Sequence, residues 1–543
     1  MGAAADATGM PKSIIELQPF RQQMRAGELS MIDLNPTVGA WFLLTLPQPG
    51  GATRDYHLEN PRPGLQALRL DAESRLRLTG KEGEVLCSLD PATAEAQLEL
   101  AARSGLPYAP LCEGRLYLRN SVPGTATALE RITDLLRDHV WGGDRLVTWV
   151  RDALFTDAFI ERGRPLAAAA ASQPLGADVG PPIARLGAAF EASAVAPEHL
   201  GIELGVASLE LGRWYPVPGE QGIDVSAIEP LALQAEAAGR ERLNPLDAVE
   251  AAALDYLVAF DVSQFELRFA LGTDHPRLGW SERSLESVRD PRTPGPDGIA
   301  SAAPLVRTGM VSPELVSRTV AAFAGGFKRE HGAFRYGPLA RQNAGSHYGF
   351  LEQGVVFSKL EPGLATVLST RDGRLEMKTW SAVDDRGLAQ VAFARQNGVP
   401  LLEPDIGSGQ ALPGMWVAHW GEGNWSGSSD ERLRTVRAGL CLAQSGPRRY
   451  LIFGYFSSAT PSAMARVFQA YGCRYAMHLD MNALEHTYFA LYGRQDGQIR
   501  VQHLIEGMAV VDRKGGRGLA PRFLAFPDDR DFFYLTRHEE PEP

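Results

Sequence analysis

Two acidic residues near the C-terminal end of the sequence, Asp480 and Glu485, are the side chains best suited to acid/base chemistry. They lie in the stretch AMHLDMNALEH. Hydrolysis of a glycosidic or glycosyl-phosphate bond usually needs one carboxyl that protonates the leaving oxygen and another that acts as base or nucleophile, at about 5 Å or about 6.5–9.5 Å. We expect Asp480 at a strand end and Glu485 in the next loop, as such a pair. The alternatives are a turn or N-cap aspartate and a solvated glutamate.

Three basic residues are candidates for holding a negative charge beside these carboxylates. Arg437 heads an apolar stretch, Arg395 lies in ARQN together with Asn397, and Lys328 follows GGF. An arginine fork suits a phosphate or carboxylate. Arg437 therefore completes the predicted catalytic set, and Arg395, Asn397 and Lys328 are predicted to bind substrate. The alternatives are structural ion pairs for the arginines and a solvated lysine.

Further polar and aromatic residues are predicted to contact the substrate: His331, Trp425, His478, Asn482 and His486. His331 lies in a glycine-rich loop, and Trp425 in GEGNWSGSS can stack on a sugar face, although a buried tryptophan is the alternative. Strand alternation puts His478 and Asp480 on one face, which also fits a metal site. Zinc needs three or four converging ligands and nothing in the sequence fixes the others. We predict no metal and no other cofactor.

The segment from Arg449 to Asp480 must position the carboxylate. YLIFGYF is typical of a buried strand, TPSAMARVFQAYG of a helix capped by Thr460 with Pro461 in its first turn, and RYAMHLDM of a second strand. A strand, a helix and a strand in about 30 residues predict a right-handed parallel crossover. Ligands collect at the carboxyl ends of strands in such units.

Changes in composition divide the chain into five parts. They are a flexible start (1–19), an α+β domain of unassigned role (20–165), a linker rich in Ala, Pro and Gly (166–199), a larger domain (200–535) and a flexible tail (536–543).

Five segments of the larger domain carry a resemblance. They are VAAFAGGFKREHGAFRYG (320–337), ATVLSTRDGRLEMKTW (365–380), FARQNGVPLLE (393–403), TVRAGLCLAQSGPRRYLIFGYF (435–456) and AMHLDMN (476–482). Through these segments and their order, residues 200–535 resemble the phosphodiester glycosidase family, to which the lysosomal "uncovering enzyme" belongs. The last segment has the LD-x-N form of a bacterial branch of that family. The resemblance implies an α+β or mixed α/β fold with a mixed sheet and packed helices. A smaller α+β domain is expected before it.

Two departures from the family pattern bear on the substrate. Ala324 stands where the family has Asn before GGF, and Met481 to Glu485 replace the glycines and serines that follow the signature aspartate. A glycine-rich loop lets backbone N–H groups approach an anion. Phosphate binding in the family's manner is therefore not expected. The protein is expected to act on another glycan linkage, or on none.

Charge and cysteine usage limit the partners and the compartment. Acidic residues outnumber basic ones by 65 to 54, for a net charge of −11, which disfavours binding to nucleic acid. No run approaches the roughly 20 apolar residues of a membrane span. The start shows no signal-peptide core, and its AAADA fits the stub left after cleavage. The pairs Cys87/Cys112 and Cys441/Cys473 favour a periplasmic or secreted protein with disulfides over four buried thiols.

The sequence thus predicts an exported bacterial hydrolase that cleaves a glycosidic bond in a glycan or sugar phosphodiester by carboxylate catalysis. The alternative is a catalytically inactive glycan-binding or envelope-scaffolding protein on the same fold. A third possibility is an intracellular protein that reuses the fold. The sequence leaves the oligomeric state open.

Overall fold

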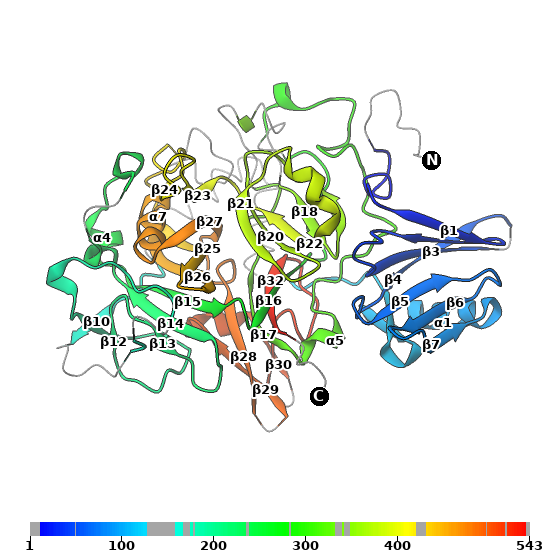
Figure 1. Ribbon diagram of the computed structural model, residues 1–543, viewed down its shortest axis with the longest axis horizontal. Coiled ribbons are helices and arrows are strands. Elements are labelled where there is room, and N and C mark those ends of the chain that lie inside the picture. The colour runs from blue at the N-terminus through cyan, green and yellow to red at the C-terminus, as the bar shows by residue number, and fades with distance from the viewer. Residues whose placement is uncertain are drawn as a thin grey trace.

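Antiparallel β-sheets dominate the protein (Figure 1). The computed structural model describes residues 11–48, 50–127, 158–166, 174–176, 180–234, 238–281, 284–331, 339–340, 348–419, 431–495, 497–515 and 518–538. Every strand pairing within the sheets of this described part is antiparallel, and its helices are few and short. The expected α+β or mixed α/β class is therefore wrong. Short apolar runs separated by Gly and Pro form hairpins here, which need no connecting helix.

The largest sheet holds the strand that carries Asp480. In spatial order its eight strands are β13 (Tyr215–Pro216), β14 (Ile223–Ile228), β15 (Asp255–Asp261), β26 (Arg448–Ala459), β25 (Thr435–Ser445), β27 (Cys473–Met481), β23 (Pro400–Pro404) and β24 (Ala411–Pro413). The long hairpin of β25 and β26 forms its centre, because both strands are apolar on both faces and buried over most of their length.

The predicted strand, helix and strand all form. Helix α7 (Pro461–Ala470) begins at Thr460, whose side chain accepts the amide of Ala463, and Pro461 occupies its first turn. Strand β25 lies between β26 and β27 and pairs antiparallel with both. The two strands therefore run in the same direction, as a parallel crossover requires, and β25 lies between them.

Two five-stranded sheets complete the larger part of the fold. One consists of β16 (Phe265–Ala270), β32 (Phe532–Arg537), β17 (Thr319–Ala324), β28 (Phe489–Gln495) and β29 (Gln498–His503). The other consists of β19 (Val355–Ser358), β18 (Phe350–Glu352), β22 (Val391–Gln396), β20 (Ala365–Thr370) and β21 (Leu375–Thr379).

Aromatic packing joins these layers into one core. Phe453 of β26 lies 5.1 Å from Phe323 and 4.9 Å from Phe489, measured between ring centroids, so the eight-stranded sheet packs on the sheet of β17 and β28. Helix α7 covers the other face of the hairpin. A side chain at Gly439 would lie 2.8 Å from the Phe468 ring, which explains how the helix packs so closely there.

The N-terminal sheets lie at one end of the molecule (Figure 1). One is six-stranded, with β1 (Gln22–Ala26), β2 (Leu29–Asp33), β3 (Trp41–Pro47), β4 (Thr53–Glu59), β9 (Leu116–Arg119) and β8 (Tyr108–Leu111); the other holds β5 (Gln66–Leu70), β6 (Leu76–Gly80) and β7 (Val85–Leu89). Helix α1 (Pro91–Arg103) packs with them over a small separate core. The buried Arg119 pairs with Glu59 of the same sheet and ties this region to the rest through a 3.6 Å contact to Glu352.

The remaining elements are short. They are β10 (Gly163–Leu166), β11 (Ala194–Pro197), β12 (Leu209–Glu210), β30 (Arg513–Gly515), β31 (Gly518–Ala520), α4 (Ala248–Ala251), α5 (Pro313–Val316) and the 3₁₀ turns η1 (Cys112–Gly114), η3 (Ala188–Phe190), η4 (Pro230–Ala232), η5 (Arg240–Arg242), η6 (Glu286–Val288), η7 (Asp384–Gln390) and η8 (Glu506–Val511). The domain boundaries drawn from the sequence stay a prediction.

Two disulfides close local loops. Cys87 bonds to Cys112 and Cys441 to Cys473, with Cα–Cα distances of 5.7 and 5.9 Å. The second bond links the neighbouring strands β25 and β27.

Candidate functional site

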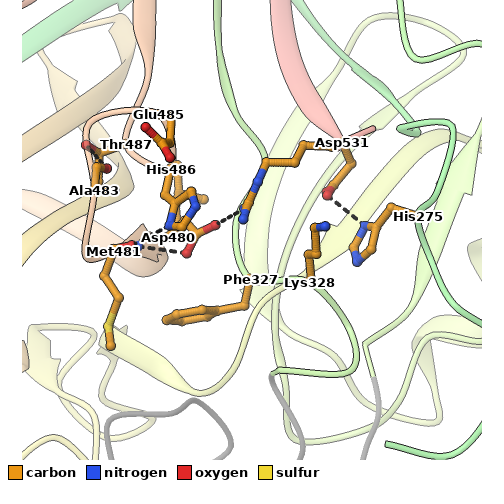
Figure 2. A network of polar contacts seen from close by, with 12 residues as sticks. His275, Phe327, Lys328, Asp480, Met481, Ala483, Glu485, His486, Thr487 and Asp531 are labelled. Carbon is orange, nitrogen blue, oxygen red and sulfur yellow. Dashed lines mark hydrogen bonds and ion pairs between the residues drawn. The ribbon is translucent and has the colours of Figure 1, made fainter. Parts of the chain in front are cut away.

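Asp480 lies near the end of β27 in a buried setting. Its residue is 5% exposed, and its Oδ2 accepts a hydrogen bond from Arg530 Nη1 at 2.7 Å. Its Oδ1 accepts the backbone N–H of Met481 at 2.8 Å. Figure 2 shows Asp480 with Met481 and His486 on one side and Lys328 opposite. The carboxylate is thus held in one orientation by a cation and by its own strand end.

The partner of Asp480 comes from a run of four charged residues, 528–531, which we call the charged segment. It directly precedes β32, and all four of its residues are at most 9% exposed. Buried charges need partners, and each member has one on a different part of the chain. The pairs are Asp528 with Arg522 (2.7 and 3.0 Å), Asp529 with Lys328 (3.6 Å), Arg530 with Asp480 (2.7 Å) and Asp531 with Arg395 (2.5 Å).

The GGF turn after β17 packs directly against the charged segment. The Gly325 amide donates to the Asp531 carbonyl at 3.0 Å. Gly326 has φ +131°, and a Cβ there would lie 2.6 Å from Arg395 Nη1. Both glycines are needed for this approach, which brings Lys328 to within 3.6 Å of Asp529.

Arg395 and Asn397 lie beneath this turn and are fully buried. Arg395 donates to Asp531, to the carbonyls of Gln396 and Phe327 and to Asn397 Oδ1. Asn397 Nδ2 donates to the carbonyl of His478 at 2.5 Å. The two predicted substrate-binding residues therefore connect β22 to β27 and to the turn. Their polar groups are used within the protein.

His275 also contacts Asp531, but it is not arranged as a catalytic base. Its Nδ1 lies 2.8 Å from Asp531 Oδ1, and its Nε2 accepts the backbone N–H of Arg329 at 2.7 Å. The nitrogen that would take a proton from a substrate is therefore occupied. Burial alone would raise the pKa of Asp531, yet the charge of Arg395 and the hydrogen bonds from Arg395 and His275 hold that pKa well below its usual range.

Arg437 and His478 lie on adjacent strands, beneath the site. The Arg437 guanidinium is 0% exposed and donates to the carbonyls of Ala459 and Leu433 at 2.7 and 2.9 Å. Its Nη1 lies 3.3 Å from His478 Nε2. Burial, and then the charge of Arg437, lower the pKa of His478 well below its ordinary value, so this ring is neutral. This geometry favours a structural role for both residues.

The loop after β27 uses its amides internally. Asn482 has φ +80°, and its N–H donates to the Val436 carbonyl at 2.9 Å. The amides of His486 and Thr487 both donate to the carbonyl of Ala483 at 3.1 Å. A phosphate cradle needs amides that point outward. The amides of Asn482, His486 and Thr487, and that of Met481, are therefore not available to a phosphate.

Glu485 lies in this loop, with 8% exposure. Its Oε1 accepts the hydroxyl of Thr127 at 3.1 Å, and its carbonyl accepts Arg522 Nη1 at 2.9 Å. Arg522 is also the partner of Asp528, so the charged segment connects the loops that carry Glu485 and Asp480. His486 Nδ1 lies 3.0 Å from the Met481 carbonyl in the same loop.

The last two predicted residues are His331 and Trp425. His331 is partly buried, and its amide donates to the Lys328 carbonyl at 3.0 Å. Trp425 lies outside the described residues. In the described part of the chain, no group of three or more His, Cys, Asp or Glu side chains is arranged to hold a metal ion. Nor does any described helix have the length and apolarity to cross a membrane.

Sequence reasoning missed the charged segment. Its Asp529, Arg530 and Asp531 supply partners for three predicted site residues, and His275 was not singled out either. A signal was present in PDDRDFFYL, where four charges directly precede an apolar strand. Such charges need buried partners once that strand enters the core.

Comparisons with known proteins give weak structural similarities. No family model matches the chain, and no curated protein matches it. Solved structures that are similar include the following three. The catalytic domain of zebrafish N-acetylglucosamine-1-phosphodiester alpha-N-acetylglucosaminidase, auto-inhibited by its pro-peptide, is 10% identical with a TM-score of 0.31, over 60% of this chain and 85% of that one. A hypothetical protein from Synechocystis is 11% identical with a TM-score of 0.21, over 92% of this chain and 97% of that one. A putative exported protein from Burkholderia pseudomallei is 9% identical with a TM-score of 0.23, over 98% of each chain. The first is a hint of the fold only.

Proposed function

We propose that this protein is an exported carbohydrate-active hydrolase in which Asp480 is the catalytic base or nucleophile. The observation that carries the proposal is the Asp480–Arg530 pair of 2.7 Å at the end of β27. In glycosidases the base or nucleophile is a charged carboxylate. An arginine partner suits Asp480 to that role, and the five ordered segments listed above support the substrate class.

Glu485 is the proposed second carboxyl. It lies in the loop that follows Asp480, and Arg522 and Thr127 hold its backbone and its side chain. Lys328 and Arg530 supply positive charge near the reacting carbon. Arg437, Arg395 and Asn397 act as positioning residues, because their hydrogen bonds join the strands and turn that hold the site.

The proposed bond is a glycosidic bond of a glycan rather than a sugar phosphodiester. Four amides of the loop 481–487 donate to acceptors within the protein, so the loop offers little to a phosphate. Export is proposed from the two disulfides, which are typical of oxidising compartments.

Turnover of a glycan panel tests this proposal. The purified chain is incubated with envelope polysaccharides, neutral oligosaccharides and sugar phosphodiesters, and new reducing ends are measured by mass spectrometry. We expect cleavage of a glycan by the native protein and a loss of about 10²-fold or more in Glu485→Gln. Cleavage that persists unchanged in Glu485→Gln would remove Glu485 from the mechanism.

A second candidate is a glycan-binding protein without catalysis. One observation favours it, because Asp480 is only 5% exposed and both of its oxygens already have partners. Binding of a polysaccharide by isothermal titration calorimetry, with no product after long incubation, would favour this candidate over the hydrolase.

A further inference from the structure

A cavity of about 370 Å³ lies beside helix α7, away from the carboxylate site. It is lined by residues of α7, α4, η4 and η5 and of the loops next to them. The part of α7 that lines the cavity is its C-terminal end, which adjoins the start of β27. Asp480 lies near the other end of that strand. Seven residues of extended strand separate Cys473 from Asp480, or about 23 Å.

The lining of this cavity is positively charged in a protein whose net charge is −11. Among the described residues that line it, three are arginines, Arg185, Arg240 and Arg466, and one is acidic, Asp247. Asp247 is already engaged. Its Oδ1 accepts the amides of Val249 and Glu250, and its Oδ2 pairs with Arg434.

Arg466 has a donor that no described residue satisfies. Its Nη2 donates to the carbonyl of Asn244 at 2.9 Å, but its Nε is buried without a hydrogen-bond partner among the described residues. Burial and the like charge of Arg240 lower its pKa, although the nearby Glu250 opposes them. The Glu250 carboxylate itself accepts the amides of Asp247 and Thr460. A half-buried guanidinium with an unsatisfied Nε favours an anionic ligand.

Gln469, one turn further along α7, offers an acceptor. Its Nε2 donates to the carbonyls of Ala238 and Ala411, both at 2.9 Å, which fixes the orientation of the amide. Its Oε1 is buried, and within the described ranges it has no donor. An unsatisfied buried acceptor costs about 1–3 kcal/mol, and a ligand hydroxyl would satisfy it.

We propose that this cavity binds a small hydroxylated organic anion of the uronic acid type. The carboxylate lies between Arg466 and Arg240, and a hydroxyl donates to Gln469. The volume fits a monosaccharide, because ligand pockets of about 300–1,000 Å³ are usual. This site is separate from the carboxylate site, and the proposal stands whether or not Asp480 is catalytic.

Calorimetric titration of the full chain tests it with three probes: glucuronate, glucose and sulfate. We expect glucuronate to bind and glucose, which lacks the carboxylate, to bind at least tenfold more weakly. Sulfate, which lacks hydroxyl donors, is also expected to bind at least tenfold more weakly than glucuronate. Equal affinity for glucose or for sulfate overturns the ligand class, and no binding of glucuronate overturns the site.

Three variants locate the binding. Arg466→Gln is expected to weaken glucuronate binding at least tenfold, and Arg240→Gln several-fold. Arg474→Gln removes the same charge from an exposed position on β27 and leaves the affinity unchanged. Arg240 is exposed, so its variant decides the matter if Arg466→Gln does not fold. Affinity that is equal in Arg240→Gln and the native protein rejects the cavity as the site.

Discussion

Removing the charge of Asp480 is expected to cost stability as well as activity. Asp480 and Arg530 form an ion pair of 2.7 Å whose side chains are both 7% exposed. In Asp480→Asn the buried guanidinium loses this counter-charge, and breaking a buried pair from one side costs about 3–5 kcal/mol. Loss of turnover in this variant alone would therefore not identify a catalytic residue.

The double variant separates the two effects. Asp480→Asn combined with Arg530→Gln removes both charges, so we expect it to recover most of the stability lost by either single change. Its turnover stays absent because the carboxylate is missing. Arg530→Gln alone keeps the carboxylate and is expected to retain part of the activity at a temperature where it is folded.

Urea unfolding and turnover at a low temperature measure the two quantities in the same four proteins. Glu376→Gln is the matched control. It breaks a pair of equal length, 2.7 Å, in which Arg374 is 67% exposed, and should cost less than about 1 kcal/mol. An Asp480→Asn protein as stable as the native one would refute the buried-pair reasoning. Turnover by the double variant would refute the catalytic role of Asp480.

Three further predictions concern the rest of the fold. Burial raises the pKa of Glu352 from 4.5 to about 7, so between these pH values the native state holds a proton that the unfolded chain has lost. The free energy of unfolding should therefore fall by about 3 kcal/mol as pH rises from 4.5 to beyond 7. A Glu352→Gln protein with the same pH dependence would contradict the assignment to Glu352. Gly326→Ala should lower the free energy of unfolding in urea by about 1–3 kcal/mol more than Gly373→Ala does. Both glycines have positive φ, but only a Cβ at Gly326 would meet a buried side chain. Equal losses in the two variants would exclude the clash. Replacing Cys441 and Cys473 by Ala should lower the unfolding free energy by about 2–4 kcal/mol, and native protein with titratable thiols would disprove the bond.

Local patterns predicted many elements of the fold correctly. The strand, helix and strand from 448 to 481 form as expected, with Thr460 as the cap, because an N-cap and a helical periodicity are properties of a few neighbouring residues. The fold class was wrong because it depends on which strands become neighbours. Strand β25 enters between β26 and β27, and nothing in the sequence between those two strands encodes that insertion.

The candidate site was predicted only in part, because a sequence shows local patterns but not which distant segments come together. Asp480 was placed correctly at a strand end, which is a local property. Its partner Arg530 lies 50 residues further on, in the segment that precedes β32, so the contact is a tertiary one. The role of Arg395 depends on Asp531 and the Phe327 carbonyl, and that of Arg437 on the Ala459 carbonyl. These contacts reach far along the chain and leave no pattern in the sequence around either arginine.

Hydrogen-bonding capacity distinguishes Asp480 from the two arginines predicted beside it. A guanidinium has five N–H donors, and the contacts of Arg395 and of Arg437 within the described residues use four of them in each case. A carboxylate has about four acceptor positions, and the contacts of Asp480 with described residues, Met481 and Arg530, use two. A substrate can therefore bind the carboxylate without displacing Arg530, whereas binding to either arginine would require breaking contacts that hold the strands together. For this reason the charge pair at Asp480, rather than the buried arginines, is where an enzyme and an inactive binding protein built on this fold would differ.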